Sequence, residues 1–237
     1  MFSFLDTSAD YSFKLVLVGP AMSGKSAIYE QLRDNDFPIT YEPTTKSDSF
    51  TKRIQVKSMT TKVEVWDTPG QEKYRSEVAS KIEGCDALIF VYDPTSTSSI
   101  AEVKELIGQY GSQSTTKNVL KVVVANKSDL VTKVMENPFQ GVQYRSFNLQ
   151  HYSLCSKKSE AVENLFEDIV KKMVNYQEEG LIKRRSPSKR PDEIVTHLEN
   201  GHRIEGSPQN TVIILKVEAK NTNGCSERAS CKSCAIF

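Results

Sequence analysis

The sequence lacks a surplus of charge of either sign. Lys and Arg together number 31 and Asp and Glu number 30, which leaves a net charge of +1 over 237 residues. A protein whose main partner is DNA or RNA usually carries a strong positive charge, because it must neutralise phosphates. The balance of charge therefore gives no reason to expect a nucleic-acid partner.

Long apolar runs and a cysteine framework are also missing. No stretch approaches the ~18 apolar residues that a membrane-spanning helix needs. Residues 1–11 lack the basic region that begins a secretory signal. The five cysteines are an odd number spread over the chain, which does not suggest disulfide pairs, and Cys85 beside an apolar run is expected to be a core residue. These absences predict a soluble intracellular protein.

The composition changes near residue 176. Between residues 13 and 176, short apolar runs alternate with amphipathic segments, whereas residues 177–237 are mostly polar. We expect an N-terminal extension over residues 1–12, a folded domain over 13–176 and a largely disordered tail over 177–237. Within the tail, the strand-like run 211–217 would either pair with a sheet edge or remain a solvated apolar patch.

Periodicity within the first region predicts the fold. Apolar, β-branched runs that suit buried parallel strands cover residues 13–18, 63–66, 87–92 and 120–125. Ser99 with Glu102 predicts a capping box, and Asn137 with Pro138 predicts another helix start. One face of a final helix is formed by Val162, Leu165, Phe166, Ile169 and Met173. Strands that alternate with helices predict an α/β fold with a doubly wound, mostly parallel sheet.

A phosphate-binding pattern follows the first predicted strand directly. Residues 19–26, Gly-Pro-Ala-Met-Ser-Gly-Lys-Ser, match G-x-x-x-x-G-K-[ST] between a strand and a helix. Backbone N–H groups of such a loop wrap a diphosphate, Lys25 reaches the β- and γ-phosphates, and the Ser26 hydroxyl ligates Mg²⁺. The nucleotide contacts predicted here are Gly19, Ala21, Met22, Ser23, Gly24, Lys25, Ser26 and Ala27.

A second motif predicts which base is bound. Asn126-Lys127-Ser128-Asp129 follows an apolar run, at the carboxyl end of a predicted strand, where open α/β sheets bind ligands. The Asp129 carboxylate can accept hydrogen bonds from both N1–H and the 2-amino group of guanine, a donor pair that adenine lacks. Asn126, Lys127 and Asp129 are therefore predicted to contact a guanine nucleotide.

The run Trp66-Asp-Thr-Pro-Gly-Gln-Glu72 lies between these motifs and supplies candidate catalytic groups. Asp67 is placed to reach Mg²⁺ through water, and Gly70 can bring a backbone N–H to a γ-phosphate. Gln71 can orient an attacking water, so Gln71, Lys25 and Gly70 are the predicted catalytic residues. In a purely structural interpretation, Asp67 would cap a helix and Gln71 would be an exposed turn residue.

With these motifs in order, the chain resembles Ras-superfamily small GTPases over about residues 13–176. Phe37 and Tyr41-Glu-Pro-Thr44 resemble the first switch of that family, in which Phe37 and Tyr41 would contact the nucleotide and Thr44 would close over Mg²⁺ and the γ-phosphate. Cys155-Ser156-Lys157 resembles the S-A-K element, whose backbone contacts the guanine carbonyl. Trp66, residues 71–75 and Val91-Tyr-Asp93 look more like the Rab branch than Ras itself.

The resemblance implies a P-loop NTPase fold of the Ras-like G-domain type and a GTP/GDP switch that uses Mg²⁺. It also implies exchange factors, effectors and a GTPase-activating protein, which should supply an arginine because none is obvious in cis. Ala21 and Met22 replace glycines of Ras, Pro69 replaces the usual alanine, and residues 45–47 lack the isoleucine and glycine typical of Rabs. Slow hydrolysis is therefore expected, and a guanine-nucleotide scaffold with negligible hydrolysis is the alternative. A P-loop kinase would need a basic acceptor site that we do not find.

The last four residues, Cys234-Ala-Ile-Phe237, match a C-a-a-X box, which predicts prenylation of Cys234 with geranylgeranyl favoured by Phe. Because one lipid anchors only reversibly, Cys231 and Cys225 are candidate palmitoylation sites. A basic cluster lies farther upstream and consists of Lys183, Arg184, Arg185, Lys189 and Arg190. These features predict attachment to the cytoplasmic face of a plasma membrane or endomembrane, with a cytosolic pool.

Overall fold

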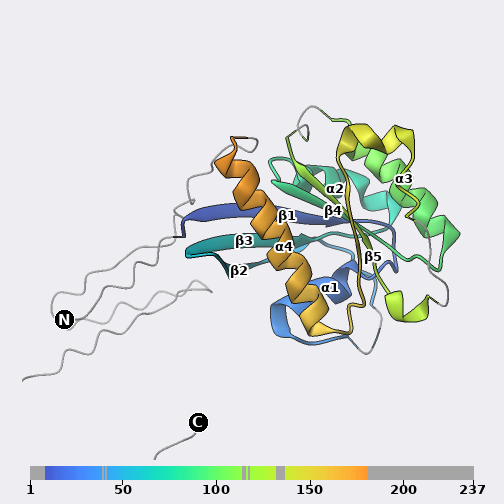
Figure 1. The fold of residues 1–237 in the computed structure, drawn as a ribbon. Helices are drawn as coiled ribbons and strands as arrows, with labels where there is room; N and C mark the ends of the chain where they lie inside the picture. Colours follow the sequence, from blue (N-terminus) through green and yellow to red (C-terminus); the bar gives the residue numbers. More distant parts are fainter. Residues whose placement is uncertain are drawn as a thin grey trace, which may run out of the picture. The chain divides into compact units, whose positions relative to one another are not determined.

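The computed structural model describes residues 9–38, 40, 42–113, 116, 118–131 and 137–180. These residues form a six-stranded sheet with helices on both faces (Figure 1). The strands are β1 (Tyr11–Val18), β2 (Asp48–Val56), β3 (Met59–Asp67), β4 (Ala87–Tyr92), β5 (Leu120–Ala125) and β6 (Gln150–Ser153). The α-helices are α1 (Lys25–Asp34), α2 (Arg75–Ile82), α3 (Thr97–Gly111) and α4 (Ser159–Glu178), and the 3₁₀ helices are η1 (Glu72–Tyr74), η3 (Ser128–Leu130) and η4 (Val142–Phe147).

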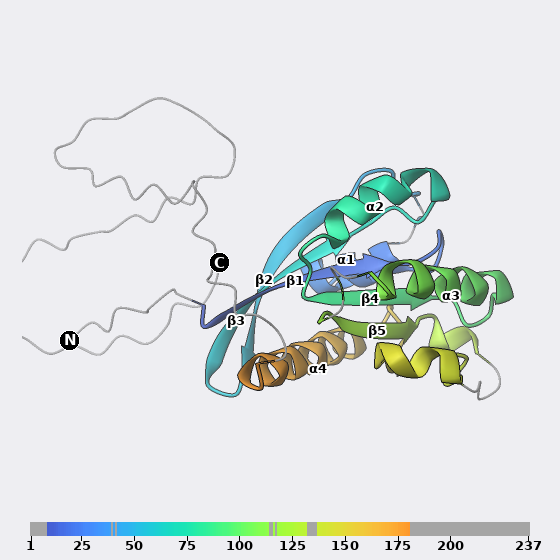
Figure 2. The same ribbon diagram turned by 90° about the horizontal axis from the view of Figure 1, so that it is seen from above.

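The strand order is β2-β3-β1-β4-β5-β6, and it confirms the predicted doubly wound, mostly parallel sheet. β1 pairs in parallel with both β3 and β4, and β5 pairs in parallel with β4 and β6. β2 is the exception, because it forms an antiparallel hairpin with β3. Since β1, β4 and β5 are neighbouring parallel strands, their carboxyl ends meet at one edge (Figure 2), where such sheets bind ligands.

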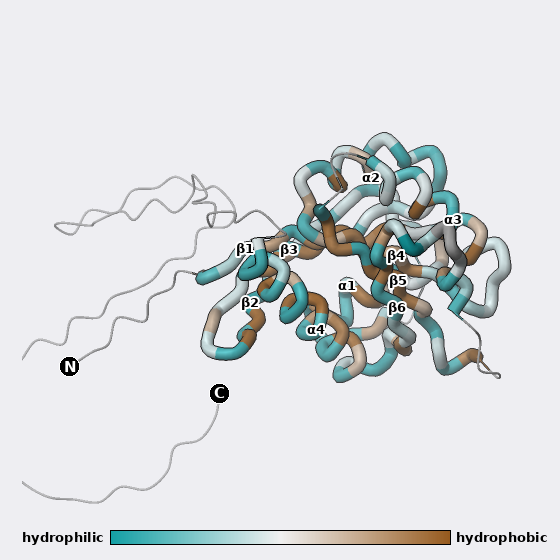
Figure 3. The backbone as a smooth tube through the Cα atoms, turned by 45° about the horizontal axis from the view of Figure 1, so that its top comes forward, coloured by the Kyte–Doolittle hydropathy of each residue, from teal (hydrophilic) through white to brown (hydrophobic). Residues whose placement is uncertain are grey.

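Each face of the sheet has its own apolar core. Alternate residues of β1, including Leu15 and Leu17, face α1 and α4, whereas Val16 and Val18 face α2 and α3. The residues of β4 and β5 are all buried, because helices cover both of their faces. Figure 3 shows this as hydrophobic colour concentrated in the central strands. The buried central strands form a fixed base for the loops at their carboxyl ends.

The predicted strands differ from the observed ones mainly at the sheet edges. The bounds predicted for β4 and β5 are confirmed, whereas β1 begins at Tyr11 and the predicted run 63–66 is the centre of the longer β3. β2 and β6 were not predicted. β2 has exposed polar residues at Asp48, Thr51, Arg53 and Gln55, and β6 has four residues, so neither forms an apolar run.

Two helix starts were predicted wrongly. The residue that caps α3 is Ser96, whose Oγ accepts from the Ser99 backbone N–H at 3.2 Å, whereas Ser99 is inside the helix and buried. Asn137 begins a turn, not a helix, because its Oδ1 accepts the Phe139 backbone N–H at 3.0 Å. The chain becomes helical only at Val142, and then as the short η4.

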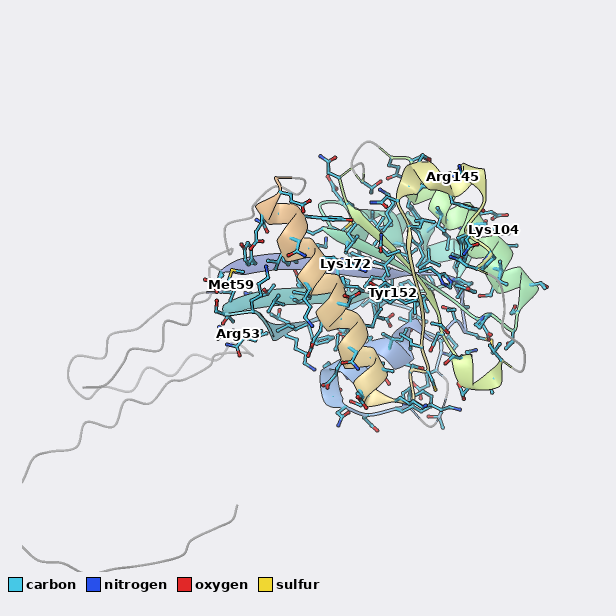
Figure 4. The ribbon with its side chains drawn as sticks, viewed as in Figure 1. Arg53, Met59, Lys104, Arg145, Tyr152 and Lys172 are labelled. Atoms are coloured by element: carbon cyan, nitrogen blue, oxygen red, sulfur yellow. The ribbon has the colours of Figure 1, made fainter. Side chains whose placement is uncertain are left out.

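Helix α4 confirms the predicted apolar face, because Val162, Leu165, Phe166, Ile169 and Met173 are buried. It continues to Glu178, two residues into the predicted tail. On its other side, Lys172 donates to the Tyr152 hydroxyl at 2.5 Å, and Figure 4 shows these side chains next to one another. None of the helices in the described ranges is long and apolar enough to cross a membrane. The run 211–217, the basic cluster and Cys225, Cys231 and Cys234 lie outside the described residues.

Candidate functional site

Most predicted site residues line one cleft of about 550 Å³ at the carboxyl edge of the sheet. They are Ala21, Met22, Gly24, Lys25, Ser26, Ala27, Phe37, Thr44, Gly70, Gln71, Asn126, Lys127, Asp129, Ser156 and Lys157. Ser23, Asp67 and Cys155 are buried beside these residues in the chain, and Gly19 lines a smaller cavity of about 320 Å³. Tyr41 lies outside the described residues. The structure thus brings together, in one cleft, residues from Ala21 to Lys157 that lie far apart in the sequence.

The phosphate loop has close backbone contacts at two glycines. A Cβ on Gly24 would lie 2.1 Å from Asn126 Nδ2, and the backbone φ of 91° at Gly24 disfavours other residues. A Cβ on Gly19 would lie 2.2 Å from the Val91 carbonyl oxygen. Glycine at these positions lets the loop lie against β4 and β5 while α1 begins at Lys25. The N-terminus of α1 therefore faces the cleft, as an anion site requires.

Lys25 provides a buried positive charge beside this helix terminus. Its side chain is 5% exposed, and Nζ donates to the carbonyl oxygens of Gly19 at 2.9 Å and Pro20 at 2.8 Å. Burial lowers the pKa of the Lys25 ammonium to about 8, although the nearby Asp67 acts in the opposite direction. Neutral carbonyl groups compensate the charge only partly, so an anion in the cleft would stabilise it.

The side-chain oxygens of Ser26, Thr44 and Asp67 lie close together. Ser26 Oγ donates to Asp67 Oδ2 at 2.6 Å and lies 2.6 Å from Thr44 Oγ1, while Thr44 Oγ1 is 3.5 Å from Asp67 Oδ2. Asp67 Oδ1 is buried and has no hydrogen-bond partner within the described ranges. Hydroxyl and carboxylate oxygens are the ligands that Mg²⁺ prefers. The orphaned carboxylate oxygen and the donor set both fit this ion.

The pKa of Asp67 also fits a bound cation. Burial raises the pKa of its carboxyl, and the Ser26 hydroxyl and Lys25 ammonium offset this only in part. A divalent cation would reverse the effect because it stabilises the carboxylate directly. The next residue, Thr68, is fixed through its Oγ1, which donates to the Leu17 carbonyl of β1 at 2.6 Å. Sequence reasoning missed this anchor, which holds the end of β3 beside the phosphate loop.

Gly70 and Gln71 form a wall of the cleft near Lys25. A Cβ on Gly70 would lie 2.4 Å from the Ala21 backbone nitrogen, so the chain after β3 packs closely against the phosphate loop. Gln71 is partly exposed, directly before η1, and also lines the smaller cavity towards α3. Its amide is therefore free to approach a ligand at this end of the cleft.

Asn126 connects the phosphate loop with the base-recognition loops. It is fully buried, its Nδ2 donates to the Ser23 carbonyl at 3.1 Å, and its Oδ1 accepts from the Ser156 backbone N–H at 3.1 Å. Both hydrogen bonds lie within the protein, so Asn126 holds the two loops together, and its predicted contact with a guanine nucleotide stays a prediction. This arrangement places the loop 155–157 opposite residues 126–129.

Asp129 is held by the S-A-K-like element. Cys155 Sγ donates to Asp129 Oδ1 at 3.2 Å, and Lys157 Nζ donates to Oδ2 at 2.7 Å. Lys157, followed by Cys155, lowers the pKa of the Asp129 carboxyl, which is therefore charged at neutral pH. Each carboxylate oxygen has two lone pairs, so one on each remains for a donor in the cleft. This fits the predicted pair of guanine donors.

Other predicted residues complete the lining. Phe37 is partly buried and lines the same cleft as Lys127. Ala27 extends the lining into α1. Met22 is 65% exposed and has a φ of 62°, in the left-handed region that favours glycine. Asp93 was not predicted as a site residue, yet its Oδ2 accepts from Lys127 Nζ at 2.7 Å. The sequence feature that could have identified Asp93 as a site residue is its position directly after β4, whose end lies beside the ends of β1 and β5.

Comparison with known proteins agrees with this geometry. The Ras family profile matches residues 14–175. The Ras-related protein Rab-1D of Dictyostelium discoideum is 30% identical over 174 residues, which cover 71% of this chain and 85% of that protein. The Ras-related protein Rab-1 of Theileria annulata is 31% identical over 163 residues, 68% of this chain and 74% of that protein. The Rab-1 of Theileria parva is 30% identical over the same shares. The chain therefore belongs to the Ras family of small GTPases, which bind GTP and GDP and hydrolyse GTP.

Proposed function

We propose that the protein is a membrane-tethered GTP/GDP switch in vesicle traffic or signalling, with slow hydrolysis unless an activating partner assists. The observation that carries the proposal is that the side-chain oxygens of Thr44, Ser26 and Asp67 lie within hydrogen-bond distance of one another. Thr44 belongs to the irregular segment between α1 and β2, and its hydroxyl is 2.6 Å from Ser26 Oγ. A segment held by contacts to the metal and γ-phosphate closes in the GTP state and is released after hydrolysis.

The catalytic roles follow from the positions of four groups. Ser26, Thr44 and Asp67 would hold Mg²⁺, which would supply a Lewis acid that neutralises phosphate charge. Lys25 places its ammonium against the β- and γ-phosphate oxygens, and Gly70 donates its backbone N–H to the γ-phosphate. Gln71 orients the attacking water. Phosphoryl transfer needs this positioning and electrostatic stabilisation more than covalent participation.

Substitution of Thr44 tests the switch. Thr44→Ala removes the contact to the metal position, so release of a fluorescent GTP analogue should accelerate about fivefold, a loss of about 1 kcal/mol. GDP release should change much less, because the switch is already open with GDP. Thr45→Ala is the matched control, since Thr45 is exposed and does not line the cleft. Equal acceleration of GTP and GDP release would contradict a switch that senses the γ-phosphate.

A scaffold with negligible hydrolysis is the second candidate. The close approach of Gly70 to Ala21 favours it, because Ala21 adds a methyl group and Pro69 stiffens the chain where Gln71 must move. Single-turnover phosphate release from protein preloaded with GTP, with and without a candidate activating protein, separates the two. No release under either condition would favour the scaffold.

The tether and the domain division rest on the sequence. We propose a G domain over residues 13–176 and a tail over 177–237 that carries a prenyl group on Cys234 and a second lipid on Cys231. The Rab relatives support the assignment to a membrane surface. Cys234→Ser should move the protein to the soluble fraction, and unchanged membrane recovery would contradict the tether.

A further inference from the structure

Asp93 lies at the point where the two halves of the cleft meet. It follows the last residue of β4, and β4 lies between β1, which leads into the phosphate loop, and β5, which leads into Asn126 (Figure 2). The Asn126 backbone N–H donates to the Tyr92 carbonyl at 2.9 Å, so the chain ends of β4 and β5 stay in register. Asp93 does not line the cleft itself, and no role in the proposed reaction uses it.

The carboxylate of Asp93 is fixed from several directions. Oδ1 accepts from the Thr95 backbone N–H at 2.8 Å and from Thr95 Oγ1 at 2.6 Å, and the Asp93 backbone N–H donates to Ser99 Oγ at 2.9 Å. This leaves Oδ2 for Lys127 Nζ at 2.7 Å. The Asp93 side chain is 14% exposed. Burial acts to raise the pKa of its carboxyl, but the hydrogen bonds from Lys127 and Thr95 outweigh burial and lower the pKa.

Lys127 is the partner that reaches the cleft. It follows the buried Asn126, lines the cleft with Asp129, and has a φ of 57° and ψ of 38°, in the left-handed region. A non-glycine residue keeps this backbone only where its surroundings over-determine it. The ion pair with Asp93 draws the ammonium away from the cleft towards β4. The apolar stem of the lysine is then left as lining, in the way that long basic side chains cover apolar surface.

We propose that Asp93 is a positioning residue for nucleotide retention, which acts by holding the Lys127 stem as a wall of the base pocket. The inference rests on the proposed nucleotide site, because it needs a base between the lining residues. The β4–α3 turn, which contains Asp93, would then affect the rate at which GDP is released. Asp93 would have this effect through its contact with Lys127.

A double-mutant cycle on release of a fluorescent GDP analogue, with Mg²⁺ and excess unlabelled GDP, tests the inference. Asp93→Asn removes the charge and should speed release about tenfold, which corresponds to about 1.4 kcal/mol. Lys127→Met keeps an apolar stem without the ammonium and should speed release by a similar factor. If Asp93 acts through Lys127, the double variant should release GDP no faster than Lys127→Met alone.

Two further variants separate positioning from a general loss of structure. Thr95→Val loosens the Asp93 carboxylate without touching the ion pair, and should speed release by a smaller factor. Asp168→Asn removes another lysine-paired carboxylate, 3.1 Å from Lys172 on α4, and should leave release as in wild type. If both Asp93→Asn and Thr95→Val released GDP at the wild-type rate, the inference about Asp93 would be wrong, while the proposed nucleotide site would stand. The same conclusion would follow if Asp93→Asn still accelerated GDP release about tenfold in the Lys127→Met background. A wild-type protein that bound no GDP would instead overturn the proposed site and the inference with it.

Discussion

At the base end of the cleft, hydrogen bonds within the protein hold Asn126, Lys127 and Asp129, so the recognising groups are oriented before a ligand arrives. At the phosphate end, the charged groups are only partly satisfied. Lys25 donates to two neutral carbonyl groups, and Asp67 Oδ1 has no hydrogen-bond partner in the part of the chain that the structure describes. The base end is therefore preorganised, whereas we propose that the nucleotide and its metal complete the phosphate end.

The pKa values of the two ends show the same difference. Lys157 and Cys155 lower the pKa of the Asp129 carboxyl, which favours the charged form that the predicted recognition of guanine requires. Burial lowers the pKa of Lys25 to about 8 and raises that of Asp67, so both charged forms are disfavoured without a ligand. A diphosphate beside Lys25 and a cation beside Asp67 would remove these penalties. Binding energy should therefore be concentrated at the phosphate end.

Lys25→Met should have the largest effect on affinity. It removes at least two charge-assisted hydrogen bonds to phosphate, and should weaken GDP binding about thousandfold. The matched control is Lys121→Met, since Lys121 is also 5% exposed and its Nζ donates to the carbonyl oxygens of Thr116 and Val119, away from the cleft. Titration with a fluorescent GDP analogue measures both. Equal affinity losses in the two variants would show that burial of a lysine, not phosphate binding, is what matters.

Gln71→Leu tests whether the phosphate end also carries the chemistry. Leucine can neither accept a hydrogen bond from water nor donate one to the developing charge, so turnover assisted by an activating protein should fall about hundredfold or more. Affinity for GDP should remain, because Gln71 is expected to contact the water and not the base. Phosphate release from preloaded protein is the measurement. Release as fast as in wild type would exclude Gln71 as the group that orients water.

Asp129→Asn tests the base end and should have a smaller effect. The substitution replaces two acceptors with one acceptor and one donor, which fits xanthine better than guanine. GTP should bind at least about tenfold more weakly, while XTP binding improves. Competition of GTP and XTP against the labelled nucleotide measures the exchange of preference. Unchanged GTP affinity would contradict the guanine assignment.

Much of this cleft was predictable, because its groups follow buried strands or a loop pattern with a chemical reason. The runs at 87–92 and 120–125 are buried on both faces, so an unbroken apolar pattern marked β4 and β5 with their observed bounds. The motif at 126–129 was placed correctly at the end of β5 for the same reason. Continuous burial produces a clear sequence signal.

The features that escaped prediction depend on tertiary contacts. β2 lies at the sheet edge and mixes exposed and buried residues, so only its pairing with β3 shows it to be a strand. Ser96 caps α3, whereas Ser99 lies inside the helix and its Oγ accepts from the Asp93 backbone N–H. Asp93 and Thr68 act on the site through Lys127 and Leu17, partners that are 34 and 51 positions away in the chain. No local pattern indicates such pairs.

Ala21→Gly should have the smallest effect, and it tests whether the methyl group of Ala21 slows hydrolysis at the phosphate end. Gly70 packs against the backbone of Pro20 and Ala21, so we expect the methyl group of Ala21 to limit how the Gly70–Gln71 segment settles. Removal of this methyl should raise the intrinsic rate of hydrolysis about threefold from the ~10⁻⁴ s⁻¹ scale of unassisted Ras, and leave GDP affinity unchanged. Ala21→Ser is the control, because it keeps the Cβ and should not accelerate hydrolysis. If both variants hydrolysed GTP at the wild-type rate, the methyl group would not limit Gln71. Slow turnover would then have to come from Pro69, which stiffens the same segment from the other side.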